Sequence, residues 1–120
     1  MYKRQLDTLS KFPDVIGVAH CFSSSYEVAK KLIDMGFYIS FSGNLTFKNS
    51  HLPDVAKKLP LNKILVETDS PFLSPVPHRG KVNEPGRTRF VADLLAKLHG
   101  STINQIASIT TNNATNLFNL

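Results

Sequence analysis

The stretch Ile64-Leu65-Val66-Glu67-Thr68-Asp69-Ser70-Pro71 decides the fold. Three aliphatic residues without a turn signal are typical of a strand that is buried on both faces, as in a parallel sheet. Because side chains alternate along a strand, we expect Glu67 and Asp69 on one face at its carboxyl end. Two buried anions need a cationic partner such as a metal ion or a base, unless the strand reaches water and both carboxylates are hydrated.

The composition is that of one globular domain. The chain has 120 residues, of which 42% are hydrophobic and 19% charged, and this excludes a disordered chain. It contains no apolar run near the ~20 residues that cross a bilayer, and no apolar segment follows Lys3-Arg4. We therefore expect a soluble, cytoplasmic protein without a membrane partner. The single cysteine, Cys21, excludes an internal disulfide and fits a reducing compartment.

The formal net charge is +5. This excess favours a polyanionic partner such as nucleic acid. The basic residues are scattered along the chain, however, so ordinary solvated helix faces remain an alternative explanation.

Strand and helix patterns alternate along the chain. Each of three aliphatic or aromatic segments ends in polar residues and is followed by helical spacing, which predicts parallel strands joined by right-handed crossovers. Between the third strand and the next helix, a proline-rich and basic loop over 72–85 is long enough to suggest a function. The predicted strands cover 15–20, 37–43 and a segment that starts at Ile64 and ends before Pro71. The predicted helices cover 5–11, a segment that opens with Ser24-x-x-Glu27 and ends before Gly36, 52–59, 90–98, a segment that opens with Thr102-x-x-Gln105, and a separate last helix from Thr111 or Asn112.

Three parallel strands make an incomplete sheet. Both edges are unpaired, and helices cover only part of its apolar surface. Eight strand–helix units closing into a barrel need about 250 residues. The chain is therefore expected to be a piece of such a barrel, or else a narrow doubly wound sheet that is completed by dimerisation.

The candidate site lies where the strands end. In parallel α/β folds, sites form at the carboxyl ends of strands, where His20, Ser42, Glu67 and Asp69 fall. An imidazole and a carboxylate together suit a divalent metal that activates water for hydrolysis. The alternative is a histidine that is satisfied by a backbone carbonyl. Alternation along the strand predicts that Cys21 points toward the helices as a buried thiol.

Four motifs together resemble one known family. In chain order they are His20-Cys21-Phe22-Ser23, Gly36-Phe37-Tyr38-Ile39-Ser40-Phe41-Ser42-Gly43, Glu67-Thr68-Asp69-Ser70-Pro71 and Pro77-His78-Arg79-Gly80-Lys81-x-Asn83-Glu84-Pro85. Their order and approximate spacing over residues 12–120 resemble the carboxyl-terminal half of the TatD family of metal-dependent deoxyribonucleases. The resemblance implies a TIM-like barrel of the amidohydrolase type, with strands six to eight supplied here. Residues 1–120 are then the C-terminal half of the domain, and the N-terminal half is absent.

The resemblance also implies roles for particular residues. His20 resembles the metal-binding histidine at the end of strand six. Asp69 resembles the metal-binding aspartate at the end of strand eight, which also accepts a proton from the attacking water. The resemblance implies no metal-binding role for Glu67, but its position suits a hydrogen bond to a residue that binds the metal. His78 and Arg79, in the long loop, are expected to contact a substrate phosphate. The metal is a divalent ion, and magnesium, manganese and zinc all remain open.

The chain lacks part of the family pattern. TatD-like proteins have a His-x-His on strand one, and a Glu and a further His on middle strands, without counterparts here. We therefore expect the missing N-terminal half-barrel as a partner and an inactive isolated chain. The expected function is hydrolysis of phosphodiester bonds in a DNA substrate. The alternatives are a metal hydrolase acting on a small amide or ester, and a non-catalytic remnant that binds nucleic acid.

Overall fold

The computed structural model describes residues 2–120 and has the predicted parallel α/β architecture. Strands β1 (Val18–Ala19), β2 (Tyr38–Phe41) and β3 (Ile64–Val66) form one sheet in the order β1-β2-β3, and both pairings are parallel. The register pairs Val18 with Tyr38 and Ile39 with Ile64. The first strand is only two residues long, shorter than the 15–20 segment predicted for it.

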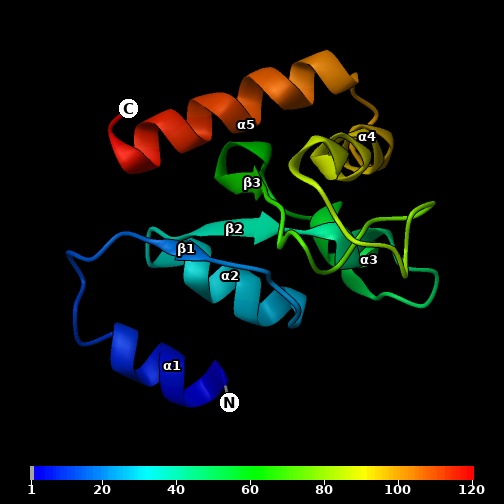
Figure 1. Ribbon diagram of the computed structural model, residues 1–120. Helices are drawn as coiled ribbons and strands as arrows, with labels where there is room; N and C mark the ends of the chain where they lie inside the picture. Colours follow the sequence, from blue (N-terminus) through cyan, green and yellow to red (C-terminus); the bar gives the residue numbers. More distant parts are fainter. Residues whose placement is uncertain (1) are drawn as a thin grey trace.

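Helices pack on both sides of these strands, with α5 on one side and α1 and α2 on the other (Figure 1). Short 3₁₀ turns follow β2 and precede β3 and α4. The helices are α1 (Tyr2–Leu9), α2 (Tyr26–Asp34), α3 (Leu52–Ala56), α4 (Thr88–Leu98) and α5 (Ile103–Phe118), and the 3₁₀ turns are η1 (Gly43–Thr46), η2 (Leu61–Lys63) and η3 (Pro85–Arg87).

Helix α5 corrects one prediction. The separate helix expected from Thr111 or Asn112 does not exist, because α5 continues through these residues. Thr110 Oγ1 donates to the carbonyl of Ile106 2.8 Å away, and Asn113 Nδ2 donates to Leu61 and Ile64 carbonyls, both at 2.8 Å. A polar side chain does not interrupt a helix when it has a hydrogen-bond partner, either on the same helix or on a neighbouring element.

The core lies between the sheet and the helices. Its largest side chains are fully buried, and the rings of Phe22 and Phe41 meet edge to face with their centroids 6.2 Å apart. Burying each such ring stabilises the fold by about 1.5–3 kcal/mol. This core fixes the strands in place, so that their carboxyl ends lie at one edge of the sheet. Among residues 2–120, no helix is long and apolar enough to cross a membrane.

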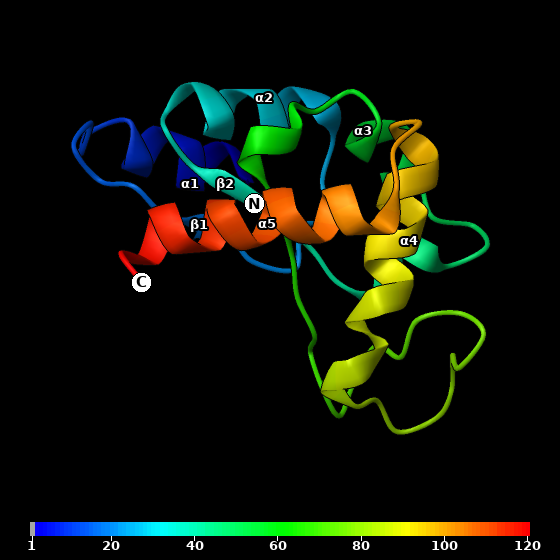
Figure 2. The ribbon, with the colours of Figure 1, turned by 90° about the horizontal axis from the view of Figure 1, so that it is seen from above.

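The long segment between β3 and η3 extends beyond helices α4 and α5 (Figure 2). It lies close to the end of β2, because a Cβ added at Gly43 would be 1.8 Å from the carbonyl oxygen of Leu73. The amide of Val76 also donates to Thr46 Oγ1 at 2.9 Å. The loop is therefore packed onto the carboxyl edge of the sheet, beside the candidate site.

Candidate metal centre

The three candidate side chains come from segments that directly follow β1 and β3. His20 follows β1, while Glu67 and Asp69 follow β3. Backbone hydrogen bonds extend the sheet past the strand ends: the amide of Phe22 donates to Ser40 and the amide of Glu67 to Phe41, each at 3.0 Å. These bonds fix the two segments on either side of β2, at the same edge of the sheet.

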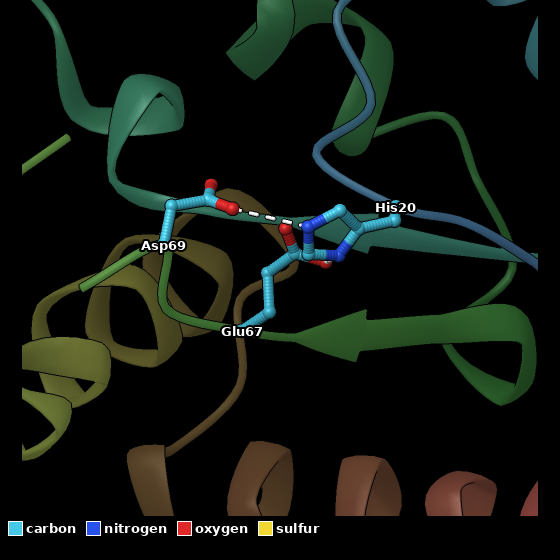
Figure 3. A group of neighbouring side chains, drawn as sticks. All are labelled: His20, Glu67 and Asp69. Atoms are coloured by element: carbon cyan, nitrogen blue, oxygen red, sulfur yellow. Dashed lines mark ion pairs between the residues drawn. The ribbon is translucent and has the colours of Figure 1, made fainter. Parts of the chain in front are cut away.

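The imidazole of His20 lies between the two carboxylates (Figure 3). Its Nδ1 is 2.9 Å from Glu67 Oε2, and its Nε2 is 3.0 Å from Asp69 Oδ1. The Glu67 and Asp69 side chains are only 12% and 20% exposed, against 63% for His20. The predicted common face of Glu67 and Asp69 is confirmed, and hydrated carboxylates are excluded. Both ring nitrogens of His20 face carboxylates instead of a backbone carbonyl.

The two carboxylates have different surroundings. Both oxygens of Glu67 face donors, since Oε1 accepts from the backbone amide of Cys21 at 2.9 Å and Oε2 faces His20 Nδ1. Asp69 Oδ1 faces His20 Nε2, but Asp69 Oδ2 is buried and has no hydrogen-bond partner within residues 2–120. A buried carboxylate oxygen without a partner costs about 1–3 kcal/mol or more. Glu67 is satisfied by the protein, whereas Asp69 keeps one oxygen without a partner in the described residues.

The donor set fits a divalent cation. A neutral imidazole carries one N–H, so if Nδ1 donates to Glu67, Nε2 presents a lone pair to Asp69 Oδ1. Two ligand atoms about 2.1 Å from one ion and at about a right angle lie about 3.0 Å apart, as these two atoms do. Ligand atoms of His20, Glu67 and Asp69 all lie within 4.8 Å of one another. Imidazole nitrogen with carboxylate oxygen admits zinc, manganese or magnesium in different sites.

Cys21 corrects the prediction made for it. Its backbone adopts a φ of 47°, so the strand alternation ends at His20, and the thiol lies part-buried at the carboxyl edge. Its Sγ is 3.5 Å from the hydroxyl of Ser42, whose side chain is fully buried. Burial raises the pKa of the thiol, and the Asp69 and Glu67 carboxylates raise it further, although the hydrogen bond to Ser42 lowers it. The neutral thiol is therefore the favoured form beside the carboxylates.

His78 and Arg79 lie on the long loop and pack against aromatic rings. The Arg79 guanidinium carbon is 3.9 Å from the centre of the Phe47 ring, and the His78 ring meets Phe90 with centroids 5.3 Å apart. In the described part of the chain, neither side chain bonds to His20, Glu67 or Asp69. The structure thus brings together the predicted metal residues and leaves the predicted substrate residues on the neighbouring loop.

Two residues near the site had no role assigned from the sequence. Thr68 lies between Glu67 and Asp69, and its hydroxyl bonds to the hydroxyl of Ser70 and accepts from Asn83 Nδ2. Asn83 is 6% exposed. The sequence did indicate a structural role for Asn83, because an asparagine within a proline- and glycine-rich loop often bonds to the backbone. Its partners, however, depend on the path of the loop.

Comparison with known proteins identifies the family. The family model described as TatD related DNase matches residues 2–119. The chain belongs to the TatD family. Two bacterial relatives of this TatD-family chain carry the description uncharacterized metal-dependent hydrolase. YcfH of Escherichia coli K12 is 51% identical over 111 residues, which cover 92% of this chain and 42% of YcfH. YabD of Bacillus subtilis 168 is 50% identical over 105 residues, which cover 87% of this chain and 41% of YabD.

A solved structure supports the same relationship. The crystal structure of YjjV, a TatD homologue from Escherichia coli K12, superimposes with a TM-score of 0.90 at 31% identity, over 99% of this chain and 47% of YjjV. The parallel α/β fold is therefore similar to that of TatD hydrolases. The TatD-family chain spans less than half the length of these relatives. The relatives are described as metal-dependent hydrolases, and His20, Glu67 and Asp69 form a group that could hold such a metal.

Proposed function

We propose that this chain is the C-terminal half of a TIM-like barrel, strands six to eight, of a metal-dependent hydrolase that cleaves phosphodiester bonds in DNA. The observation that carries the proposal is the pairing of His20 Nε2 with Asp69 Oδ1 at 3.0 Å, next to a buried Asp69 oxygen without a partner. The relatives' description as metal-dependent hydrolases supports the metal, and the family description as DNases supports the substrate. The cytoplasmic location expected from the sequence belongs to the same proposal.

The open edges of the sheet support a missing N-terminal half-barrel. Within residues 2–120, β1 and β3 pair only with β2, so each has one free edge. A groove of about 520 Å³ lies between α1 and the β1 edge, lined in part by Val18 and Phe37. A second groove of about 310 Å³ lies between α5 and the sheet, lined in part by Val18, Leu65 and Phe118. Unpaired edges beside apolar grooves are where further strands of a barrel would add.

The three residues of the site divide into distinct roles. His20 Nε2 and Asp69 would hold the divalent ion, which when bound acidifies a water molecule and polarises a phosphoryl oxygen. Glu67 accepts from His20 Nδ1 and so fixes the ring with Nε2 toward Asp69. Asp69 Oδ2 is free to accept a proton from the attacking water. Two ligands are fewer than the three that the protein usually gives a catalytic zinc, so the remaining ligands are assigned to the missing half.

The long loop would contribute substrate contacts. The guanidinium of Arg79 lies over the ring of Phe47, and the residue is exposed to solvent. A guanidinium offers a bidentate fork that matches a phosphate group. His78 precedes it on the same loop, and the net charge of +5 favours a polyanion. These features favour DNA over a small neutral ester.

The test is a chimera that joins the part of YcfH not matched by this chain to the whole 120-residue chain. We expect metal-dependent cleavage of DNA, lowered about a hundredfold or more by His20→Ala and by Asp69→Asn, because each removes a ligand or a proton acceptor. The control variants are His51→Ala and Asp54→Asn, since the Asp54 side chain is 79% exposed and pairs only with Lys57.

Each alternative has its own outcome. Cleavage of generic esters or amides without cleavage of DNA would assign the chain to a small-molecule hydrolase. Salt-dependent DNA binding without metal-dependent cleavage would indicate a binding remnant. Near-normal turnover with normal metal content in Asp69→Asn would refute the site assignment.

A further inference from the structure

We propose that Asn83 is a positioning residue that ties the long loop to Thr68 and thereby fixes Asp69 and the loop as one unit. This inference rests on the proposed function for the role of Asp69. The tie itself is visible in the contacts of Asn83, which is 6% exposed although it lies in an otherwise exposed part of the loop.

The backbone amide and the side-chain amide of Asn83 both bond to residues at the start of the loop. Its backbone amide donates to the carbonyl of Pro71 at 2.9 Å, and its Nδ2 donates to the carbonyl of Phe72 at 2.8 Å. Its Oδ1 accepts from the amide of Glu84 at 2.9 Å. The start and the end of the segment 71–84 are therefore joined, and the residues between them, including His78 and Arg79, form a closed loop.

The same side chain reaches the metal segment. Asn83 Nδ2 also donates to Thr68 Oγ1 at 3.3 Å, and Thr68 Oγ1 accepts from the amide of Ser70 at 3.1 Å. Thr68 lies between Glu67, which contacts His20 Nδ1, and Asp69, which contacts His20 Nε2. The network therefore fixes the backbone on both sides of Asp69.

The contacts of Arg87 restrain the loop but do not reach Asp69. Arg87 Nη1 donates to Ser74 Oγ at 3.0 Å and to the carbonyl of Val82 at 2.7 Å. These bonds hold the middle of the loop to the start of α4. Loss of the Asn83 side chain should therefore release the junction between loop and site without unfolding the chain.

The first test is limited trypsin digestion of the 120-residue chain. Trypsin cleaves after Arg79 and Lys81 in the loop, and after Lys30 and Lys31 in α2, which serve as internal controls. We expect Asn83→Ala to raise the cleavage rate in the loop about tenfold, since its side chain donates two hydrogen bonds there. Cleavage in α2 should not change. The matched control Asn49→Ala, at an exposed position, should alter neither rate.

The second test uses the chimera with the unmatched part of YcfH, which supplies the remaining ligands, and measures its binding of Zn²⁺ alone by competition with a chromophoric chelator. Asn83→Ala and Thr68→Val are each expected to weaken binding about tenfold, because partners that orient ligands contribute at least this much. Thr68→Val keeps the Asn83 bond to Phe72, so it should leave loop cleavage near the wild-type rate. A purely structural role would change cleavage throughout the chain and leave zinc affinity of the folded protein unaltered.

The outcomes separate this inference from the proposed function. Selective loop cleavage with weakened zinc binding supports the role of Asn83. Equal increases in loop and α2 cleavage, or no increase, would overturn it. If the wild-type chimera binds no zinc, the metal assignment fails, while the trypsin ratio of the 120-residue chain still decides whether Asn83 holds the loop. Should Asn83→Ala not fold, Asn83→Asp keeps the shape and the acceptor to Glu84 and is judged by the same ratio.

Discussion

Substituting Glu67 by glutamine would test whether Glu67 orients His20 or binds the metal itself. Glutamine has the same shape, but one carboxylate oxygen becomes an NH₂ group. In the wild-type chain both oxygens face donors, the amide of Cys21 at 2.9 Å and His20 Nδ1 at 2.9 Å. When Nε2 binds the metal, Nδ1 must carry the proton, so whichever way the glutamine amide is turned, one of these donors meets another donor. Glu67→Gln therefore loses one hydrogen bond and weakens the hold on the imidazole.

The expected size of the effect follows from this contact. Removing the carboxylate that orients a ligating histidine lowers metal affinity about 10- to 100-fold. The lost bond should also lower the free energy of unfolding by about 1 kcal/mol. By contrast, His20→Ala and Asp69→Asn remove the proposed ligands, and their loss of affinity should be larger. The control is Glu84→Gln, because the Glu84 side chain is 69% exposed and its ion pair with Arg87 spans 3.8 Å.

The assay is zinc competition with a chromophoric chelator on the chimera with the unmatched part of YcfH, together with urea unfolding of each variant. Zinc binding by Glu67→Gln equal to the wild type would show that Glu67 does not orient the ring. A loss as large as that of His20→Ala would show that Glu67 is itself a ligand. Either result would refute the division of roles between Glu67 and Asp69.

Two further predictions concern the edge of the sheet. The raised pKa of Cys21 lowers the thiolate fraction at any pH, so alkylation by iodoacetamide should have its midpoint at higher pH in the folded chain than in urea; equal midpoints would contradict this. Gly43→Ala should destabilise the chain by about 1–3 kcal/mol, measured by urea unfolding, because its Cβ would lie 1.8 Å from the Leu73 carbonyl oxygen. Gly86→Ala, whose Cβ would meet nothing within 4 Å, is the control, and equal losses would show that the loop yields freely.

Features governed by local geometry could be predicted from the sequence. Alternation along a strand placed Glu67 and Asp69 on one face, and both side chains contact His20. A helix that opens at Thr102 was also predicted, and the structure has a capping box there: Gln105 N donates to Thr102 Oγ1 at 3.1 Å and Thr102 N donates to Gln105 Oε1 at 3.0 Å. Each of these features depends on residues close together in the chain.

Features that depend on tertiary structure were missed. The thiol of Cys21 turns to the carboxyl edge because the residue adopts a φ of 47°, which side-chain alternation in a regular strand does not anticipate. Helix α5 runs past Thr111 because Asn113 finds acceptors on η2 and β3, more than 45 residues earlier in the chain. The contacts of Asn83 likewise require the loop to return to β3. A sequence pattern alone contains none of these partners.

The alternation at the end of β3 separates two tasks between neighbouring residues. Glu67 and Asp69 contact His20, while Thr68 between them bonds to Asn83. The amide of Phe72 donates to the carbonyl of Asp69 at 2.8 Å, so the loop begins with a bond to the metal segment itself. Any displacement of the loop therefore acts on Asp69 through two bonded routes, whereas Glu67 is held independently by Cys21. Substitutions in the loop should accordingly alter the Asp69 side of the site and leave the orientation of His20 by Glu67 intact.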